Sequence, residues 1–137
     1  MRVVFDTNIF VSAFVIPGGR ADRALLNIIE GRDDLVLSKA ILDELLSVLV
    51  AKFSRDEDEI SRIALFLSEI AEWTKPAETI NILKDEPDNR ILECASCGKA
   101  EVIVTGDKEM LRLGSFRGVK ILSLKAYLES GDKEADR

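Results

Sequence analysis

The sequence predicts an α/β fold: a single three-layer domain with a central, mainly parallel sheet flanked by helices. Short apolar runs that are typical of buried strands alternate with segments whose apolar residues recur every three or four positions. This alternation favours parallel strands joined by helices on both faces of one sheet. A length of 137 residues and a hydrophobic fraction of 47% suffice for one domain with its own core.

The first half of the chain predicts two strands and three helices. In order, these are a strand at residues 3–5, a loop at 17–19, a helix that stops at Gly31, a strand at 35–37, a helix from Ser38 to about Lys52 and a helix over about 56–71. Ser38 is a residue type that caps helices well. The acidic run at residues 56–59 suits a helix N-terminus, where negative charge is favourable.

The second half of the chain predicts two more strands. After Pro76 we expect a turn or short helix at residues 80–83, a helix that follows 85–88, a strand at 102–104, a short helix at 109–113, a strand at 119–122 and a last helix at 125–129. We assign residues 1–130 to the domain and residues 131–137 to a charged, frayed C-terminal tail.

Composition limits the functional classes. The net charge of −6 argues against broad electrostatic binding of nucleic acid, although a local basic rim around an acidic cleft is compatible with it. The first residues do not resemble a signal peptide, and no apolar stretch approaches the roughly 18 residues that span a bilayer. We therefore expect a cytoplasmic protein without membrane contact.

The two cysteines form a single C-x-x-C pair, Cys94 and Cys97, on a predicted helix. The chain has no histidine and no second cysteine pair, which excludes a four-ligand Cys/His zinc site within one chain. We expect two small buried helix residues, with a redox role as the alternative.

Two of the predicted strands lead to an aspartate. Asp6 follows VVF, and Asp107 follows VIVTG. Each could be only a turn former or a helix cap. The C-terminal ends of parallel strands share one edge of a sheet, however, and ligands bind there in open α/β folds. We therefore expect Asp6 and Asp107 to converge in one site.

Two further acids suit the same site. On the helix after Ser38, Glu44 lies about 90° from the centre of the apolar face, whereas Asp43 lies about 170° away and is solvated. Asp88 stands where a helix begins, as an anion stabilised there or as an ordinary N-cap. Four carboxylates in one cleft would repel one another, and a divalent cation resolves that conflict. Oxygen-only ligands favour Mg²⁺ or Mn²⁺, as one or two ions.

Four separated motifs together resemble the PIN domain, in particular the branch of toxins related to VapC. These motifs are FDTNIFVSA at residues 5–13, LSKAILDEL around Glu44, DNRILECA at residues 88–95 and VTGDKEML at residues 104–111. The likeness extends from Arg2 to about Leu128. Glu101 departs from it, since an Asp is expected before the VIVTGD strand, and we expect a structural role for this residue.

The resemblance implies a metal-dependent ribonuclease that belongs to a toxin–antitoxin pair. Its metal ligands would be Asp6, Glu44, Asp88 and Asp107. Polar positions that would orient the acids or metal-bound water are Thr7, Asn8, Asn89 and Thr105. Candidate phosphate contacts are Arg20, Arg23, Lys108 and Arg112. An antitoxin and a second copy of the chain are the implied protein partners, and RNA is the implied substrate.

Other interpretations stay open. Asp85 and Glu86 could reach a second metal, but a solvated loop is the simpler expectation. A phosphatase of the haloacid dehalogenase type would need an acid where this chain has Asn8. A flap-endonuclease-like DNA nuclease would need more helices than this length allows. The non-enzymatic alternative is a PIN fold that serves as an RNA-binding module. A PIN-fold module that processes RNA without a toxin role is a further alternative.

Overall fold

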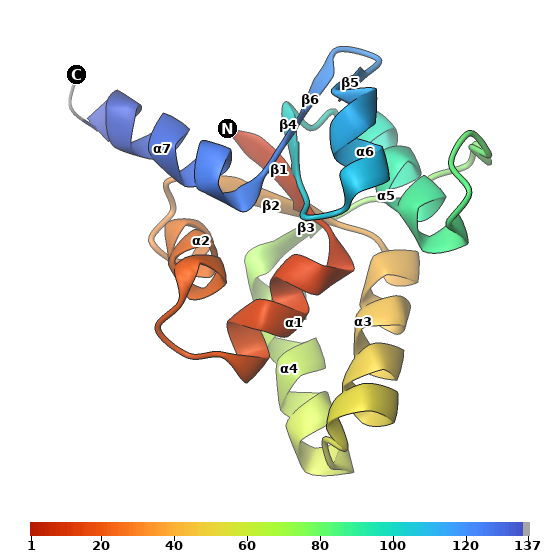
Figure 1. Cartoon of the computed structure of the whole chain (residues 1–137). Helices are drawn as coiled ribbons and strands as arrows, with labels where there is room; N and C mark the ends of the chain where they lie inside the picture. Colours follow the sequence, from red (N-terminus) through yellow and green to blue (C-terminus); the bar gives the residue numbers. More distant parts are fainter. Residues whose placement is uncertain (136–137) are drawn as a thin grey trace.

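The computed structural model describes residues 1–135, and the side chains of residues 1–131 (Figure 1). The strands are β1 (Arg2–Phe5), β2 (Asp34–Leu37), β3 (Ala71–Trp73), β4 (Val102–Val104), β5 (Ser115–Phe116) and β6 (Val119–Leu122). The helices are α1 (Thr7–Val15), α2 (Arg20–Ile29), α3 (Lys39–Phe53), α4 (Glu57–Ile70), α5 (Glu86–Cys97), α6 (Lys108–Leu113) and α7 (Leu124–Ala135).

The strands form one sheet in the order β3-β2-β1-β4-β6-β5. All neighbours are parallel except the pair of β5 and β6. In the centre of the sheet, Phe5 lies opposite Val104 in register, so β1 and β4 end side by side. The predicted three-layer α/β fold is confirmed.

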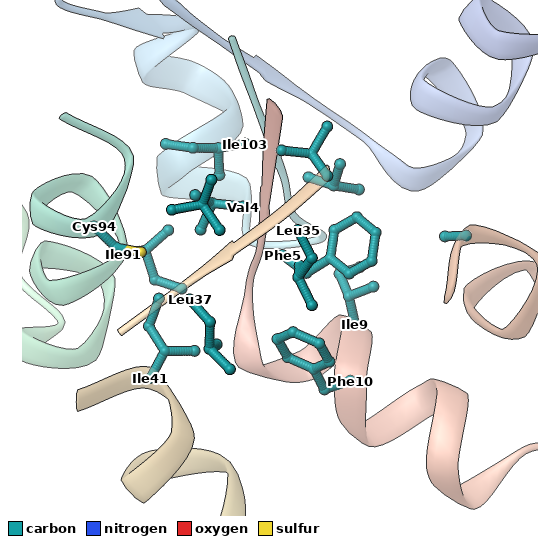
Figure 2. Close-up of a cluster of buried hydrophobic side chains, with 14 of the residues drawn as sticks. Val4, Phe5, Ile9, Phe10, Leu35, Leu37, Ile41, Ile91, Cys94 and Ile103 are labelled. Atoms are coloured by element: carbon teal, nitrogen blue, oxygen red, sulfur yellow. The ribbon is translucent and has the colours of Figure 1, made fainter. Parts of the chain in front are cut away.

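The core lies on both faces of the central strands (Figure 2). Ile91 and Cys94 of α5 pack on one face, while Ile9 and Phe10 of α1 pack on the other. The ring of Phe5 lies 5.7 Å from that of Phe10 and 5.8 Å from that of Tyr127, measured between centroids. Because the strands are buried on both faces, their sequences are continuously apolar rather than alternating.

Three elements were not expected from the sequence. Helix α1 is apolar on almost every side, so its sequence has no clear helical periodicity. Strand β3 has only three residues, two of them exposed, at the edge of the sheet, and β5 has only two residues. The segment at residues 80–83 forms no helix and is held instead by side chains of α5.

The last helix is longer than expected. Helix α7 continues to Ala135, so residues 131–135, which we assigned to a frayed tail, are helical. Residues 136–137 of that tail lie outside the described residues. No helix among residues 1–135 is long and apolar enough to cross a membrane.

The two cysteines have different environments. Cys94 is fully buried under the sheet, and burial raises the pKa of its thiol to about 12. Cys97 is exposed, which corrects the expectation that both are buried, and it accepts a hydrogen bond of 2.9 Å from the Thr74 hydroxyl. Both are free thiols.

Candidate active site at the carboxyl edge of the sheet

Asp6 and Asp107 lie at the same edge of the sheet, after β1 and β4. The Asp6 backbone N–H continues the pairing of the two strands by donating to the Val104 carbonyl at 2.9 Å. Each aspartate also caps a helix: Asp6 accepts from the Asn8 N–H at 3.4 Å and Asp107 accepts from the Met110 N–H at 3.0 Å. Asp6 and Asp107 therefore cap helices and also lie at the same edge of the sheet.

Thr105 joins the two aspartates. Its hydroxyl donates to Oδ2 of Asp6 at 2.6 Å and accepts from the Asp107 backbone N–H at 3.0 Å. Thr105 is fully buried, so this arrangement is shielded from water. Thr105 was predicted to orient an acid, and the hydrogen bond from its hydroxyl to Asp6 is a contact that can do so.

Asp88 does not cap its helix. The N-cap position of α5 belongs to Asp85, whose carbonyl accepts from the Asp88 backbone N–H at 3.1 Å. The Asp88 side chain is 5% exposed, and its Oδ2 is buried without a hydrogen-bond partner among the described residues. The N-cap alternative is therefore wrong. A buried carboxylate oxygen without a partner is costly and calls for a ligand.

Electrostatics link Asp88 to the two strand-end acids. Burial, together with the negative charges of Asp107, Asp6, Asp85 and Glu109, raises the pKa of Asp88 to about 7. Burial also raises the pKa of Asp6, with the Thr105 hydrogen bond opposing it and the Asp107 charge adding to it. Asp6, Asp88 and Asp107 therefore form one electrostatic cluster, in which a cation would relieve the repulsion.

Glu44 lines a hollow next to this cluster. It is half-buried on α3 and Asp43 is exposed, as the helical geometry predicts. The hollow has a volume of about 170 Å³, and its walls include Thr7 and Pro87, the chain neighbours of Asp6 and Asp88. The structure thus brings three of the four predicted acids into one electrostatic cluster, and it places the fourth on the wall of a hollow that the chain neighbours of Asp6 and Asp88 also line.

The side chains of the site are of the kind that binds a hard divalent cation. Within the described part of the chain, no group of three acidic or cysteine side chains is arranged as it would be around a metal ion. The available donors are carboxylate oxygens, one of which, Oδ2 of Asp88, is buried and unpartnered among the described residues. Such donors suit Mg²⁺ or Mn²⁺ rather than zinc.

The other predicted polar positions behave differently from one another. Thr7 is buried and lines the hollow beside Glu44. The Asn8 side chain is exposed, and only its backbone contacts Asp6. The Asn89 amide bonds to the backbone of Ile82 and Leu83 at 2.9–3.1 Å, so it holds the loop before α5 instead of orienting an acid.

The predicted cations divide into two groups. Lys108 and Arg112 are exposed on α6, directly after Asp107. Arg20 and Arg23 lie at the start of α2, beyond the far end of α1 from Asp6 (Figure 1). Since α1 has nine residues, that end is about 13 Å away along its axis. The structure therefore does not bring Arg20 and Arg23 to the acids.

Arg90 is a residue of this edge that the sequence analysis missed. Its guanidinium binds Glu86 at 3.1 Å, Glu93 at 2.6 Å and the Ile80 carbonyl at 2.9 Å. Glu93 in turn accepts from the Ile80 N–H at 2.8 Å. The spacing of three and four residues between these charges on a helix was the available signal.

The remaining acids have simple environments. Asp85 and Glu86 are exposed, and Glu86 is engaged by Arg90. Glu101 is exposed and accepts a hydrogen bond of 2.9 Å from the Arg2 backbone N–H, which is a structural contact between β1 and the start of β4.

Comparison with known proteins agrees with this architecture. The family model of the PIN domain matches residues 2–109. An uncharacterized protein of Methanocaldococcus jannaschii, MJ1680, is 33% identical over 117 residues, which cover 82% of this chain and 75% of that protein.

Two solved structures share the fold. The structure of VapBC2 from Rickettsia felis bound to a DNA fragment from their promoter contains a chain with a TM-score of 0.64 and 21% identity, and the match covers 90% of this chain and 98% of that one. A chain of VapBC-1 from nontypeable Haemophilus influenzae has a TM-score of 0.62 and 20% identity, with 91% and 99% covered.

Proposed function

The chain belongs to the PIN domain family, and from this premise we propose that it is a Mg²⁺- or Mn²⁺-dependent endoribonuclease that acts as the toxin of a toxin–antitoxin pair. The observation that carries the proposal is the cluster of Asp6, Asp88 and Asp107, in which the buried Oδ2 of Asp88 has no hydrogen-bond partner among the described residues. Carboxylates that raise one another's pKa in this way suit the binding of one or two such ions.

In the proposed mechanism, Asp6 and Asp107 are the principal metal ligands. Thr105 orients Asp6 by donating to its Oδ2, which leaves Oδ1 as the ligand oxygen less engaged by the protein. Glu44 lines the hollow, from where it would complete the site directly or through water. When bound, the cation would supply a more acidic water and stabilise negative charge on the phosphate.

Asp88 and Glu44 are the two acids that would complete the site, directly or through water. One of them would accept the proton of the attacking water as the general base. In-line attack on an RNA phosphodiester would leave a 5′-phosphate and a 3′-hydroxyl. Lys108 and Arg112 are placed to contact the phosphates beside Asp107.

The proposal includes protein partners and a compartment. The similar solved chains come from VapBC complexes, which supports a cognate antitoxin for this chain. The likeness to PIN relatives supports a homodimer. RNA as the substrate implies action in the cytoplasm.

The test compares the wild type with Asp6→Asn and Asp107→Asn on single-stranded RNA and DNA, with Mg²⁺, Mn²⁺ or EDTA. Asparagine can still cap both helices, so the fold is preserved while the charge is lost. We expect cleavage of RNA only with metal and at least a hundredfold loss in each variant. Equal cleavage by wild type and variants would refute the assigned site. Preferred cleavage of DNA would indicate a DNA nuclease, and metal-independent RNA binding without turnover would indicate a binding module.

A further inference from the structure

A second hollow continues the candidate site along the same edge of the sheet. It has a volume of about 260 Å³ and lies where β2 and β3 end, between Ser38 and Lys39 on one side and Thr74 and Lys75 on the other. It shares two wall residues, Ala40 and Arg90, with the hollow beside Glu44. The two hollows therefore adjoin at these residues.

The two adjoining hollows form one groove, and the topology of the sheet sets its direction. Strands β3, β2, β1 and β4 are consecutive neighbours and parallel, so all four end at one edge of the sheet. The acids follow β1 and β4, whereas Lys39 and Lys75 follow β2 and β3. Adjacent strands are about 4.8 Å apart, which puts the end of β3 about 10 Å from the end of β1. This distance is within the span of a few nucleotides of an extended strand.

Charge changes sign along the groove. The hollow beside Glu44 has two carboxylates in its wall, those of Glu44 and Glu86. The second hollow has Lys39 and Lys75 and one carboxylate, that of Glu93, which is paired with Arg90 at 2.6 Å. Arg90 stands between the two hollows, with its charge engaged by two glutamates, so it serves as a wall. In a chain of net charge −6, two lysines at one end of a hollow are a local departure from the overall charge.

The two lysines are available to a ligand. Lys39 is 86% exposed, and its described ion pair, at 2.7 Å, is with Asp43, which is 57% exposed; such a surface pair contributes little energy. No carboxylate among the described residues pairs with Lys75, which is exposed. Lys39 is also the first residue of α3, where the helix dipole disfavours a cation. A contribution to the stability of α3 therefore does not explain why a lysine occupies position 39.

We propose that Lys39 and Lys75 bind two backbone phosphates of single-stranded RNA, so that the substrate passes from the acids over Ala40 toward β3. This inference rests on the proposed function. It identifies the β2–β3 side of the sheet edge, rather than the α2 side with Arg20 and Arg23, as the course of the strand. Lysine binds phosphate as a point charge without reading sequence, so the groove would position RNA without selecting it.

The test replaces both lysines by glutamine, with Lys52→Gln as the matched control. Lys52 lies in the last turn of the same helix, α3, about 20 Å from Lys39 along the axis. Binding of a 12-nucleotide single-stranded RNA is measured by fluorescence anisotropy with Mg²⁺ in the Asp107→Asn background, in which we expect no cleavage. We expect at least tenfold weaker binding for the double variant at 50 mM salt. The slope of log K against log salt should lose about 1.4, or 0.7 for each phosphate contact.

The outcomes separate this inference from the proposed function. If the double variant binds RNA with the wild-type affinity and slope, or if Lys52→Gln weakens binding equally, the groove is refuted. In that case, loss of RNA cleavage in Asp107→Asn would still support the nuclease. If Asp107→Asn cleaves RNA as the wild type does while the double variant binds weakly, the groove is supported and the assigned active site is refuted. Equal melting temperatures of all variants confirm that these differences reflect binding.

Discussion

The hydroxyl of Thr105 and the carboxylate of Asp6 form a hydrogen bond of 2.6 Å between residues 99 positions apart in the chain. The same hydroxyl accepts the Asp107 backbone N–H, so one buried side chain sets the relative positions of two strand-end acids. Such a contact holds an acid in one orientation before any ligand arrives.

Replacing Thr105 by valine should therefore impair the proposed cleavage without touching a charged group. We expect kcat/KM to fall about 10–100-fold, as for other groups that orient ligands, and stability to fall by about 1–3 kcal/mol because the Asp107 N–H loses its acceptor. Thr105→Ser keeps the hydroxyl and should restore most of the activity. Steady-state kinetics and urea unfolding measure both effects. A valine variant as active as the serine variant would contradict this role.

The raised pKa of Asp88 predicts how stability depends on pH in metal-free protein. The carboxyl has a pKa of about 7 in the folded state, against an ordinary value of 3.8 in the unfolded chain. Between these values the folded state binds more protons than the unfolded state, so this group lowers stability as pH rises from about 4 to 7. The Asp88→Asn variant has no titrating carboxyl at this position, so this contribution to the pH dependence of stability is lost. In EDTA at pH 7.5 we expect the substitution to raise Tm by at least about 3 °C, because a pKa of about 7 in place of 3.8 destabilises the fold by up to about 4 kcal/mol at this pH.

At pH 4 the difference between wild type and Asp88→Asn should largely disappear, since the folded wild type then carries a neutral Asp88. Asp43→Asn, at an exposed position of α3, is the matched control and should leave Tm unchanged at both pH values apart from its pair with Lys39. A constant difference between Asp88→Asn and wild type from pH 4 to 7.5 would show that Asp88 does not titrate in this range.

Gly98 allows α5 to lie close to β2. A Cβ atom at this position would stand 2.4 Å from Cγ1 of Val36, which is itself buried in the sheet. Gly98→Ala should therefore destabilise the fold by about 1–3 kcal/mol through overpacking. Urea unfolding measures the change. Gly106→Ala is the control, since nothing lies within 4 Å of its Cβ position. Equal stability of both variants would mean that α5 can shift away from the sheet at no cost.

The sequence predicted the parts of the fold that depend on local pattern. Asp6 and Asp107 each follow a predicted strand, and the strands were predicted to be parallel. These two predictions were sufficient to infer that the acids converge, because parallel strands end at one edge of the sheet. Helix α1 escaped prediction because burial on nearly all sides removes the polar face that marks a helix. Strand β3 escaped because pairing with β2, rather than its own three residues, defines it.

Long-range contacts account for the predicted positions that the structure does not bring to the acids. Asn89 follows Asp88 directly, yet its amide turns to the backbone of residues 82–83, a contact that sequence spacing does not specify. Arg20 and Arg23 follow a glycine-rich loop of the kind that often binds phosphate, but the length of α1 carries them away from the acids. Lys39 and Lys75 were overlooked because only the sheet brings the ends of β2 and β3 together.

The most direct test of the central claim is a calorimetric titration of Mn²⁺ into the wild type and the Asp6→Asn, Asp88→Asn and Asp107→Asn variants at pH 7.5. If the three aspartates hold the cation together, the wild type binds one or two ions per chain, and each variant binds at least tenfold more weakly while melting as a folded protein. Mn²⁺ binding by all three variants with the wild-type affinity would contradict the account, because the cluster of Asp6, Asp88 and Asp107 would then not be the metal site.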